Sequence, residues 1–300
     1  IQSYGVSSNT ITDSADLLPT LNLERLIEIA VKVGGDDHNF RVIQCPLNLL
    51  EPAAALSPRE NGKTILAMAE DANLAVLTNR PLNAILGGGL IRLAEPGEAS
   101  QAIDPAENIL KLTALEKRLR QELNVEIDTR GETIEVAYFF HWADEFNEIK
   151  HKFRNLVEWE DFLLSLINPR LNQSTNFLSH HLKDDHAKIW QELFPDYRQA
   201  IENVCQDFRL LAIERSHEET SLIRAVLDDH LPAKASLSQI AIQTAISTAG
   251  VTCVLNGMRQ SLYVEDALKA SQDDCGDITT TLFESLGPTS RQFKRRNIND

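Results

Sequence analysis

The first hundred residues alternate between strand-like and helix-like segments, and this alternation limits the possible folds more than any other feature of the sequence. Residues 1–6, 40–47 and 74–82 are predicted to be strands. Residues 23–34 and 61–73 are predicted to be helices, the first of them closed by glycines. An order of strand, helix, strand, helix, strand at this spacing is typical of parallel βα units.

A long, acidic and helical stretch follows at about residue 100. Asp104 to Glu107 has the residues of a helix start, with an acid at the N-cap, proline at the first position and glutamate completing a capping box. Leucines then recur at helical spacing from 112 to 123, and residues 135–167 and 201–211 are also predicted to be mainly helical. We therefore expect 100–235 to be a helical insertion.

The βα pattern resumes after this insertion. Ser236 and Gln239 form a second capping box, which starts a predicted helix over 237–250. Residues 251–257, "VTCVLNG", are predicted to be a strand, followed by a loop and a further helix. The sequence thus predicts an α/β protein with three parts, residues 1–99, 100–235 and 236–300, which contain four βα units and one insertion.

Composition excludes several classes of protein. The 300 residues are 43% hydrophobic and 24% charged, as in a soluble globular protein, and no apolar run is long enough to span a membrane. The net charge of -15 argues against a nucleic-acid partner, although residues 294–296 are a local basic run, either a binding patch or a solvated tail. The four cysteines are far apart, which indicates neither a zinc site nor a disulfide framework and favours a cytoplasmic location.

Four motifs carry a resemblance to a known family. "YGVSSNT", "VIQCPLNLL", "AVLTNRPLNAI" and "VTCVLNGMRQSLYVEDAL" occur in this order over residues 1–95 and 236–270. They resemble the last four strand–loop units of the aldo/keto reductases, which transfer hydride between NADPH and a carbonyl group. The resemblance implies a partial (β/α)₈ TIM barrel, made of the last four βα units, with a large helical insertion before the final strand.

The family places its nicotinamide site at the ends of the first three of these strands. The resemblance implies that Ser7 and Gln44 hydrogen-bond the carboxamide of the cofactor. Ser8 stands where the family has asparagine, and Asn79 stands where the family stacks a tyrosine on the nicotinamide ring, so both positions depart from the pattern.

The remaining implied residues belong to the phosphate and adenosine end of the cofactor. Arg80 would offer charge to the pyrophosphate, while Pro81 and Leu82 keep the family's backbone path. Three residues after the last strand, Gly257, Met258 and Arg259, would lie along the adenosine phosphate, where arginine suits the 2′-phosphate of NADP better than NAD. Asp266 stands where the family often has an acid near the adenine.

Other interpretations of these residues stay open. Ser7 and Ser8 would serve equally as turn residues, and Gln44 as a core amide. Glycines 87–89 are either a turn or a phosphate cradle.

Two further clusters resemble catalytic or metal sites only superficially. If 180–186 is helical, His181 and Asp185 lie on one face with the spacing of metal ligands, although charged runs of this kind are common. His141 is expected to be a core or surface histidine and not a catalytic one, because it lies after the seventh family strand, in the wrong order, and its segment continues as an amphipathic helix.

The family's acid–base residues, an Asp, a Tyr, a Lys and a His, lie on earlier strands than those matched here. The resemblance therefore implies no catalytic residue in this chain and a missing N-terminal half, and we expect the fragment alone not to reduce an aldehyde, ketone or sugar carbonyl. A half barrel exposes two sheet edges, which predicts pairing with that half, homo-oligomers through the edges, or cover by the insertion. The alternative function is a non-catalytic binding or scaffold protein that uses the insertion as its interaction surface.

Overall fold

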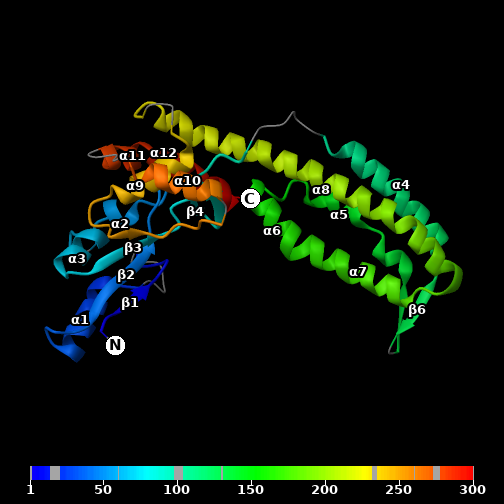
Figure 1. The fold of residues 1–300 in the computed structure, drawn as a ribbon, viewed down its shortest axis with the longest axis horizontal. Coiled ribbons are helices and arrows are strands. Elements are labelled where there is room, and N and C mark those ends of the chain that lie inside the picture. Colours follow the sequence, from blue (N-terminus) through cyan, green and yellow to red (C-terminus); the bar gives the residue numbers. More distant parts are fainter. Residues whose placement is uncertain are drawn as a thin grey trace. The chain divides into compact units, whose positions relative to one another are not determined.

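The chain divides into two compact units. The computed structural model describes residues 2–13, 21–59, 61–97, 104–129, 131–231, 235–259, 261–272 and 278–299. Unit 1 comprises residues 1–95 and 219–300, and unit 2 comprises residues 96–218 (Figure 1). The sequence placed the corresponding boundaries at 99/100 and 235/236.

Unit 1 is built on a four-stranded parallel sheet. The strands β1 (Tyr4–Ser7), β2 (Phe40–Pro46), β3 (Ala75–Asn79) and β8 (Cys253–Val254) lie side by side in that order, which is also their order along the chain. Each strand overlaps a segment that the sequence predicted to be a strand, although β1 extends one residue beyond the predicted 1–6 and β8 is shorter than expected. Parallel neighbours require crossover connections, and the intervening helices supply them.

Helices cover one face of this sheet. Alternate residues of the two central strands, Ile43, Cys45 and Val76, are fully buried in one hydrophobic cluster. The same cluster contains buried residues of α1 (Leu23–Gly34) and α3 (Ile65–Asp71). Both helices were predicted, and both begin at a side-chain cap, Asn22 for α1 and Thr64 for α3, as do many natural helices. Short α2 (Ala53–Leu56) follows β2.

A second cluster in unit 1 joins the later helices to a hairpin. It contains buried residues of α9 (Leu237–Ile246), whose predicted capping box is present in full, and of α11 (Thr279–Ser285) and α12 (Gly287–Asn299). Ala270, the last residue of α10 (Ser261–Ala270), belongs to it as well. The chain therefore ends in helices that pack within unit 1.

The hairpin was not predicted from the sequence. β4 (Asn83–Leu86) and β5 (Gly89–Arg92) are antiparallel and joined by Gly87 and Gly88. Both glycines have positive φ, 59° and 85°, which a two-residue hairpin turn of this kind requires. Of the two interpretations of this glycine run, the structure therefore shows the turn.

Unit 2 is mainly helical. It contains α4 (Ala106–Glu122), the antiparallel pair β6 (Glu126–Thr129) and β7 (Glu132–Glu135), the 3₁₀ turn η1 (Val136–Phe139) and α5 (Trp142–Ile149). The chain continues through α6 (Leu156–Phe162), the π-helical turn η2 (Leu163–Ile167), α7 (Asn168–His181) and α8 (Asp184–Leu227), whose last residues belong to unit 1.

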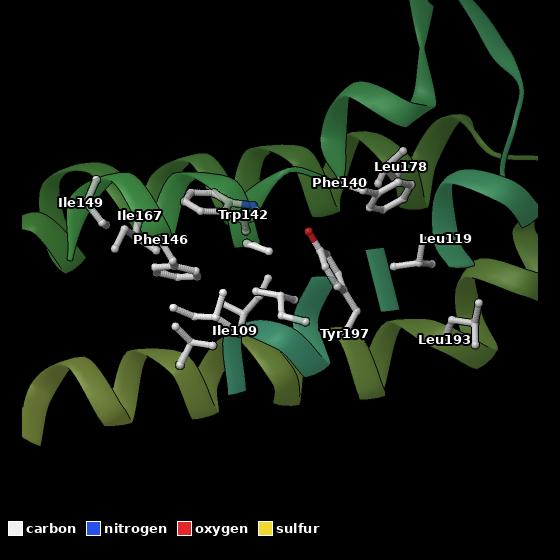
Figure 2. Packing of buried hydrophobic residues seen from close by; sticks show 14 of the residues in the cluster. Ile109, Leu119, Phe140, Trp142, Phe146, Ile149, Ile167, Leu178, Leu193 and Tyr197 are labelled. Carbon is white, nitrogen blue, oxygen red and sulfur yellow. The ribbon is translucent and has the colours of Figure 1, made fainter. Parts of the chain in front are cut away.

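An aromatic core holds unit 2 together. Figure 2 shows part of it, with Trp142, Phe146 and Tyr197 among the buried side chains. Phe208 of α8 contacts three rings, those of Phe146, Phe153 and Trp159, at centroid distances of 5.3–5.6 Å. Such ring contacts add to the free energy gained by burial, so the helical stretch has a core of its own.

Two local predictions in unit 2 need correction. The Asp104 carboxylate accepts from the Ala106 N–H at 3.0 Å, but Glu107 pairs with Lys111 and does not complete a capping box. Residues 180–186 are not one helix, because Leu182 takes an extended conformation between α7 and α8. His181 and Asp185 thus lie on different helices. No cluster of three or more metal-ligating side chains is present among the described residues.

No helix in the described parts of the chain combines the length and the apolar character that a membrane span needs.

Candidate functional site

The candidate site lies at the carboxyl ends of the parallel strands in unit 1. In open or closed parallel sheets, ligands bind at this edge because the loops that follow the strands converge there. The register places Ser7 beside Gln44, Gln44 beside Leu77 and Leu77 beside Cys253, so one row crosses all four strands. Ser7 and Cys253 are exposed, and Gln44 and Leu77 are half-buried.

This row lies on the sheet face that α1 and α3 do not cover. Side chains alternate between the two faces of a strand, and the neighbours of Gln44 on β2, Ile43 and Cys45, are fully buried in the core under the helices. Burial raises the pKa of the Cys45 thiol to about 11, which is expected of a thiol in an apolar layer. The opposite face therefore presents a hydroxyl and an amide side by side.

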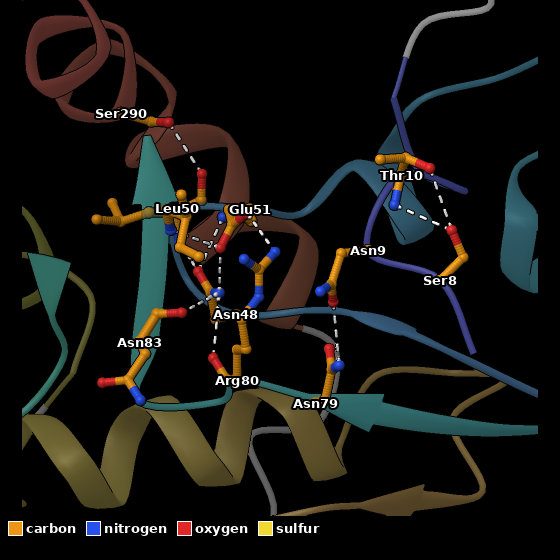
Figure 3. Close-up of polar contacts among 11 residues, drawn as sticks. Ser8, Asn9, Thr10, Asn48, Leu50, Glu51, Asn79, Arg80, Asn83 and Ser290 are labelled. Atoms are coloured by element: carbon orange, nitrogen blue, oxygen red, sulfur yellow. Dashed lines mark hydrogen bonds and ion pairs between the residues drawn. The ribbon is translucent and has the colours of Figure 1, made fainter. Parts of the chain in front are cut away.

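In the described part of the chain, neither of these groups is engaged elsewhere. The Ser7 hydroxyl and the Gln44 amide have no hydrogen-bond partner among the described residues. The backbone around them is fixed, since the Ser8 N–H donates to the Gln44 carbonyl at 3.0 Å. The Ser8 hydroxyl instead bonds within its own turn, to Thr10, as Figure 3 shows. Ser7 and Gln44 are thus available to a ligand, and Ser8 is a turn residue.

Asn79 ends β3 close to the turn that follows β1. Its side-chain N–H donates to the Asn9 Oδ1 at 3.2 Å (Figure 3), while its own Oδ1 is buried without a partner in the described part of the chain. The amide of Asn256, two residues after β8, also has a buried nitrogen with no partner there. Buried polar atoms without partners carry a free-energy cost, so each needs an explanation. Both are close in sequence to the carboxyl ends of their strands.

Arg80 belongs to a polar network beneath this edge. Its guanidinium donates to the Glu51 carboxylate at 2.9 Å, and the two side chains are only 18% and 17% exposed. The Asn48 amide donates to the same carboxylate at 2.8 Å and to the Arg80 carbonyl at 3.2 Å (Figure 3). Arg80 also has φ of 58°, a conformation that non-glycine residues rarely adopt. The network therefore holds the turn after β3, and the charge of Arg80 is paired within it.

The other predicted residues are distributed differently. Pro81 and Leu82 are buried, Leu82 in the cluster with the β4–β5 hairpin. Gly257, Met258 and Arg259 follow β8 as an exposed segment.

Asp266 of α10 is bonded to the start of α9. Its two carboxylate oxygens accept from the Ser238 hydroxyl at 2.5 Å and the Gln239 amide at 2.8 Å. The structure thus brings Ser7, Gln44 and Asn79 to one edge of the sheet, leaves Arg259 exposed, and engages Arg80 and Asp266 with other side chains.

Sequence reasoning missed the two residues that fix Arg80. Asn48 follows β2 by two residues, and its Oδ1 accepts from the N–H groups of Leu50 and Glu51. An Asx turn of this type is typical of asparagine in a loop, so "PLNLLEP" carried a signal for the turn. The pairing of Glu51 with Arg80, which are 29 residues apart, had none.

Comparison of the chain with protein-family models, with curated proteins and with solved structures gave no match.

Proposed function

We propose that unit 1 is the cofactor-binding part of an aldo/keto reductase-like oxidoreductase, with its sheet forming part of a (β/α)₈ barrel. The observation that carries the proposal is the pair Ser7 and Gln44, a hydroxyl and an amide on adjacent strands, both unpartnered among the described residues. A planar carboxamide needs a donor and an acceptor in fixed positions, and these two side chains offer both.

The residues fit a nicotinamide better than they fit the rest of the cofactor. Ser7 and Gln44 would hold the carboxamide, and the orphaned Oδ1 of Asn79 would accept a further hydrogen bond. Bound there, NADPH would supply hydride to a carbonyl carbon. Of the two arginines that the resemblance singles out, Arg259 is exposed and would hold a 2′-phosphate, whereas Arg80 is paired with Glu51. NADP is therefore the proposed cofactor, with NAD the weaker alternative.

Catalysis would need groups that this sheet does not carry. An aldehyde, ketone or sugar carbonyl is the proposed substrate class, and a proton donor for its oxygen would come from strands added to the sheet. Among the described residues, β1 and β8 each have one neighbour and so leave two edges open. We propose that four further βα units complete the barrel there, or that a second copy pairs with these edges.

Cofactor titration tests this proposal. The protein, expressed from its full coding sequence, is titrated with NADPH and with NADH, and binding is followed by the fluorescence of the reduced nicotinamide. We expect Gln44→Ala to weaken NADPH binding about tenfold, the value of one good hydrogen-bonding group. The matched control is Gln272→Ala, which removes an exposed amide after α10. Equal affinities for both variants and the parent, or no binding at millimolar NADPH, would refute the proposal.

A second candidate function is a non-catalytic binding or scaffold protein on the same frame. The engagement of Arg80 by Glu51 and of Asp266 by Ser238 favours it, because both would otherwise serve the cofactor. Under this alternative, neither NADPH nor NADH changes the melting temperature. A shift of several degrees at saturating NADPH would exclude it, because a ligand that binds only the folded state stabilises that state.

A further inference from the structure

Unit 2 contains a cavity that the proposed function does not use. Its volume is about 480 Å³, within the range of cavities that hold small molecules. One wall is a face of α7, with residues at positions i, i+3, i+4 and i+7: Arg170, Gln173, Ser174 and Phe177. The other wall comes from β7, η1 and the start of α5: Ile134, Tyr138, Phe139, His141 and Trp142.

One end of the cavity is aromatic. The Phe139 and Phe177 rings are tilted against each other at 5.2 Å, and the His181 ring stacks on Phe177 at 4.3 Å. Tyr138 stands at the rim with 70% of its surface exposed. A flat ligand can stack on the faces of these three rings, one exposed and two half-buried.

The other end of the cavity is cationic. Arg170 lies over the Trp142 ring, 5.1 Å from its centroid, and donates two hydrogen bonds to Glu145 at 2.6 and 2.7 Å. Glu145 also accepts from His141 in a contact of 2.7 Å. Burial would raise the pKa of Glu145, but its bonds to Arg170 and His141 outweigh this effect and lower the pKa. Glu145 is therefore ionised at neutral pH and orients the guanidinium.

The lining itself has one permanent charge, that of Arg170, because Glu145 does not line the cavity. A guanidinium has five N–H donors in a planar fork. Two N–H groups of Arg170 donate to Glu145, and the Arg170 side chain is still 43% exposed. The remaining N–H groups can donate to a second carboxylate.

We propose that this cavity binds a small aryl carboxylate, with its rings among Tyr138, Phe139 and Phe177 and its carboxylate on Arg170. Arg170 and Phe177 are seven residues apart on α7, about 10.5 Å along the helix axis. A two-ring aromatic acid with a short side chain has this length. The site is independent of the cofactor site, because every residue that lines it belongs to unit 2.

Paired ligands test the proposal on the full chain. Isothermal titration compares 2-naphthylacetate with 2-naphthylacetamide, which has the same rings and shape without the charge. We expect the acid to bind at least about tenfold more tightly than the amide, since a charge-assisted bond to arginine is worth this much. Equal affinities, or no binding of either compound at millimolar concentration, would overturn the proposal.

Three variants locate the site. Arg170→Gln should reduce the affinity for the acid to that for the amide. Ser174→Leu, which puts an apolar side chain into the cavity, should abolish binding of both compounds. Arg198→Gln, which breaks the exposed pair of Arg198 with Glu202 on α8, is the control and should change neither affinity. Tryptophan fluorescence confirms that each variant is folded. Undiminished binding of the acid to folded Arg170→Gln, or to folded Ser174→Leu, would also overturn the proposal.

Discussion

A buried carboxylate, Glu116, holds the start of helix α5, and its removal should destabilise unit 2. Glu116 lies on α4 and is fully buried. Its carboxylate accepts from the backbone N–H groups of Trp142 at 2.7 Å and Ala143 at 3.3 Å, and from the Tyr197 hydroxyl at 3.3 Å. Trp142 and Ala143 are the first residues of α5, whose N–H groups have no partner within the helix.

The cost of Glu116→Ala follows from these contacts. A buried N–H that loses its partner costs about 1–3 kcal/mol, and hydrogen bonds to a charged group are at the upper end of their range. The hydrogen bond to Trp142 is short, and we expect its loss to cost about 2 kcal/mol of unfolding free energy. The hydrogen bond to Ala143 is long, and we expect its loss to cost about 1 kcal/mol. A total of about 3 kcal/mol would lower the melting temperature of a unit of this size by roughly 10 °C.

Tryptophan fluorescence is the appropriate assay. The three tryptophans of the chain all lie in unit 2, so their emission follows the unfolding of this unit alone. Glu122→Ala is the matched control on the same helix, because Glu122 pairs with Arg118 at the surface and should contribute at most about 0.5 kcal/mol. If Glu116→Ala lowers the fluorescence midpoint no more than the control does, Glu116 does not hold α5.

The pH dependence of Glu116→Gln gives a second result for the same residue. Burial raises the pKa of Glu116, although its bonds to Ala143, Trp142 and Tyr197 oppose this effect. A raised pKa means that the folded state binds the proton more tightly than the unfolded state. The part of the stability that comes from this tighter proton binding is therefore fully present below the unfolded-state pKa and is lost as pH rises through the folded-state pKa. The stability of the parent minus that of the variant should fall from pH 4 to pH 7, and a difference that rises would contradict the assignment.

Two further predictions concern unit 1 and the thiols. Gly5→Ala should destabilise unit 1 by about 1–3 kcal/mol, because its Cβ would lie 2.4 Å from the Val42 carbonyl oxygen. Thermal unfolding followed by circular dichroism should show this lower stability, while the unfolding transition followed by tryptophan fluorescence stays at the same temperature. An unchanged circular dichroism transition would contradict the prediction. Iodoacetamide at pH 8 should label the exposed Cys253 well before Cys45 and Cys205, because burial raises the pKa values of these two thiols to about 11 and about 12. Peptide mass spectrometry measures the order of labelling, and equal labelling rates would contradict the prediction.

Most of the elements of unit 1 could be predicted from local pattern. The strands and helices around 1–82 have apolar spacing and caps that depend only on neighbouring residues, and α1, β2 and β3 lie where this spacing places them. The β4–β5 hairpin also had a local signal, a glycine pair between apolar residues. It was missed because the glycines were interpreted as a turn or a phosphate cradle, and no strand was predicted after them.

The candidate site could be predicted only in part. Ser7 and Gln44 were placed at strand ends, and the structure has them on adjacent strands. The pairing of Arg80 with Glu51 could not be predicted, because it depends on a left-handed turn at Arg80 that brings distant residues together. The same is true of Asp266, whose partners on α9 are 27 and 28 residues away.

The position of β8 has a consequence for the order of folding. β8 pairs with β3 across more than 170 residues, as the bond between Val76 and Thr252 shows. Closing so long a loop is entropically costly and slow. Within unit 2, however, Asn108 near its beginning bonds to Asp207 near its end at 2.6 Å. If unit 2 folds first, the loop left to close is much shorter, which saves about 1 kcal/mol of closure entropy. During synthesis on the ribosome, β8 would thus pair with β3 only after unit 2 had folded.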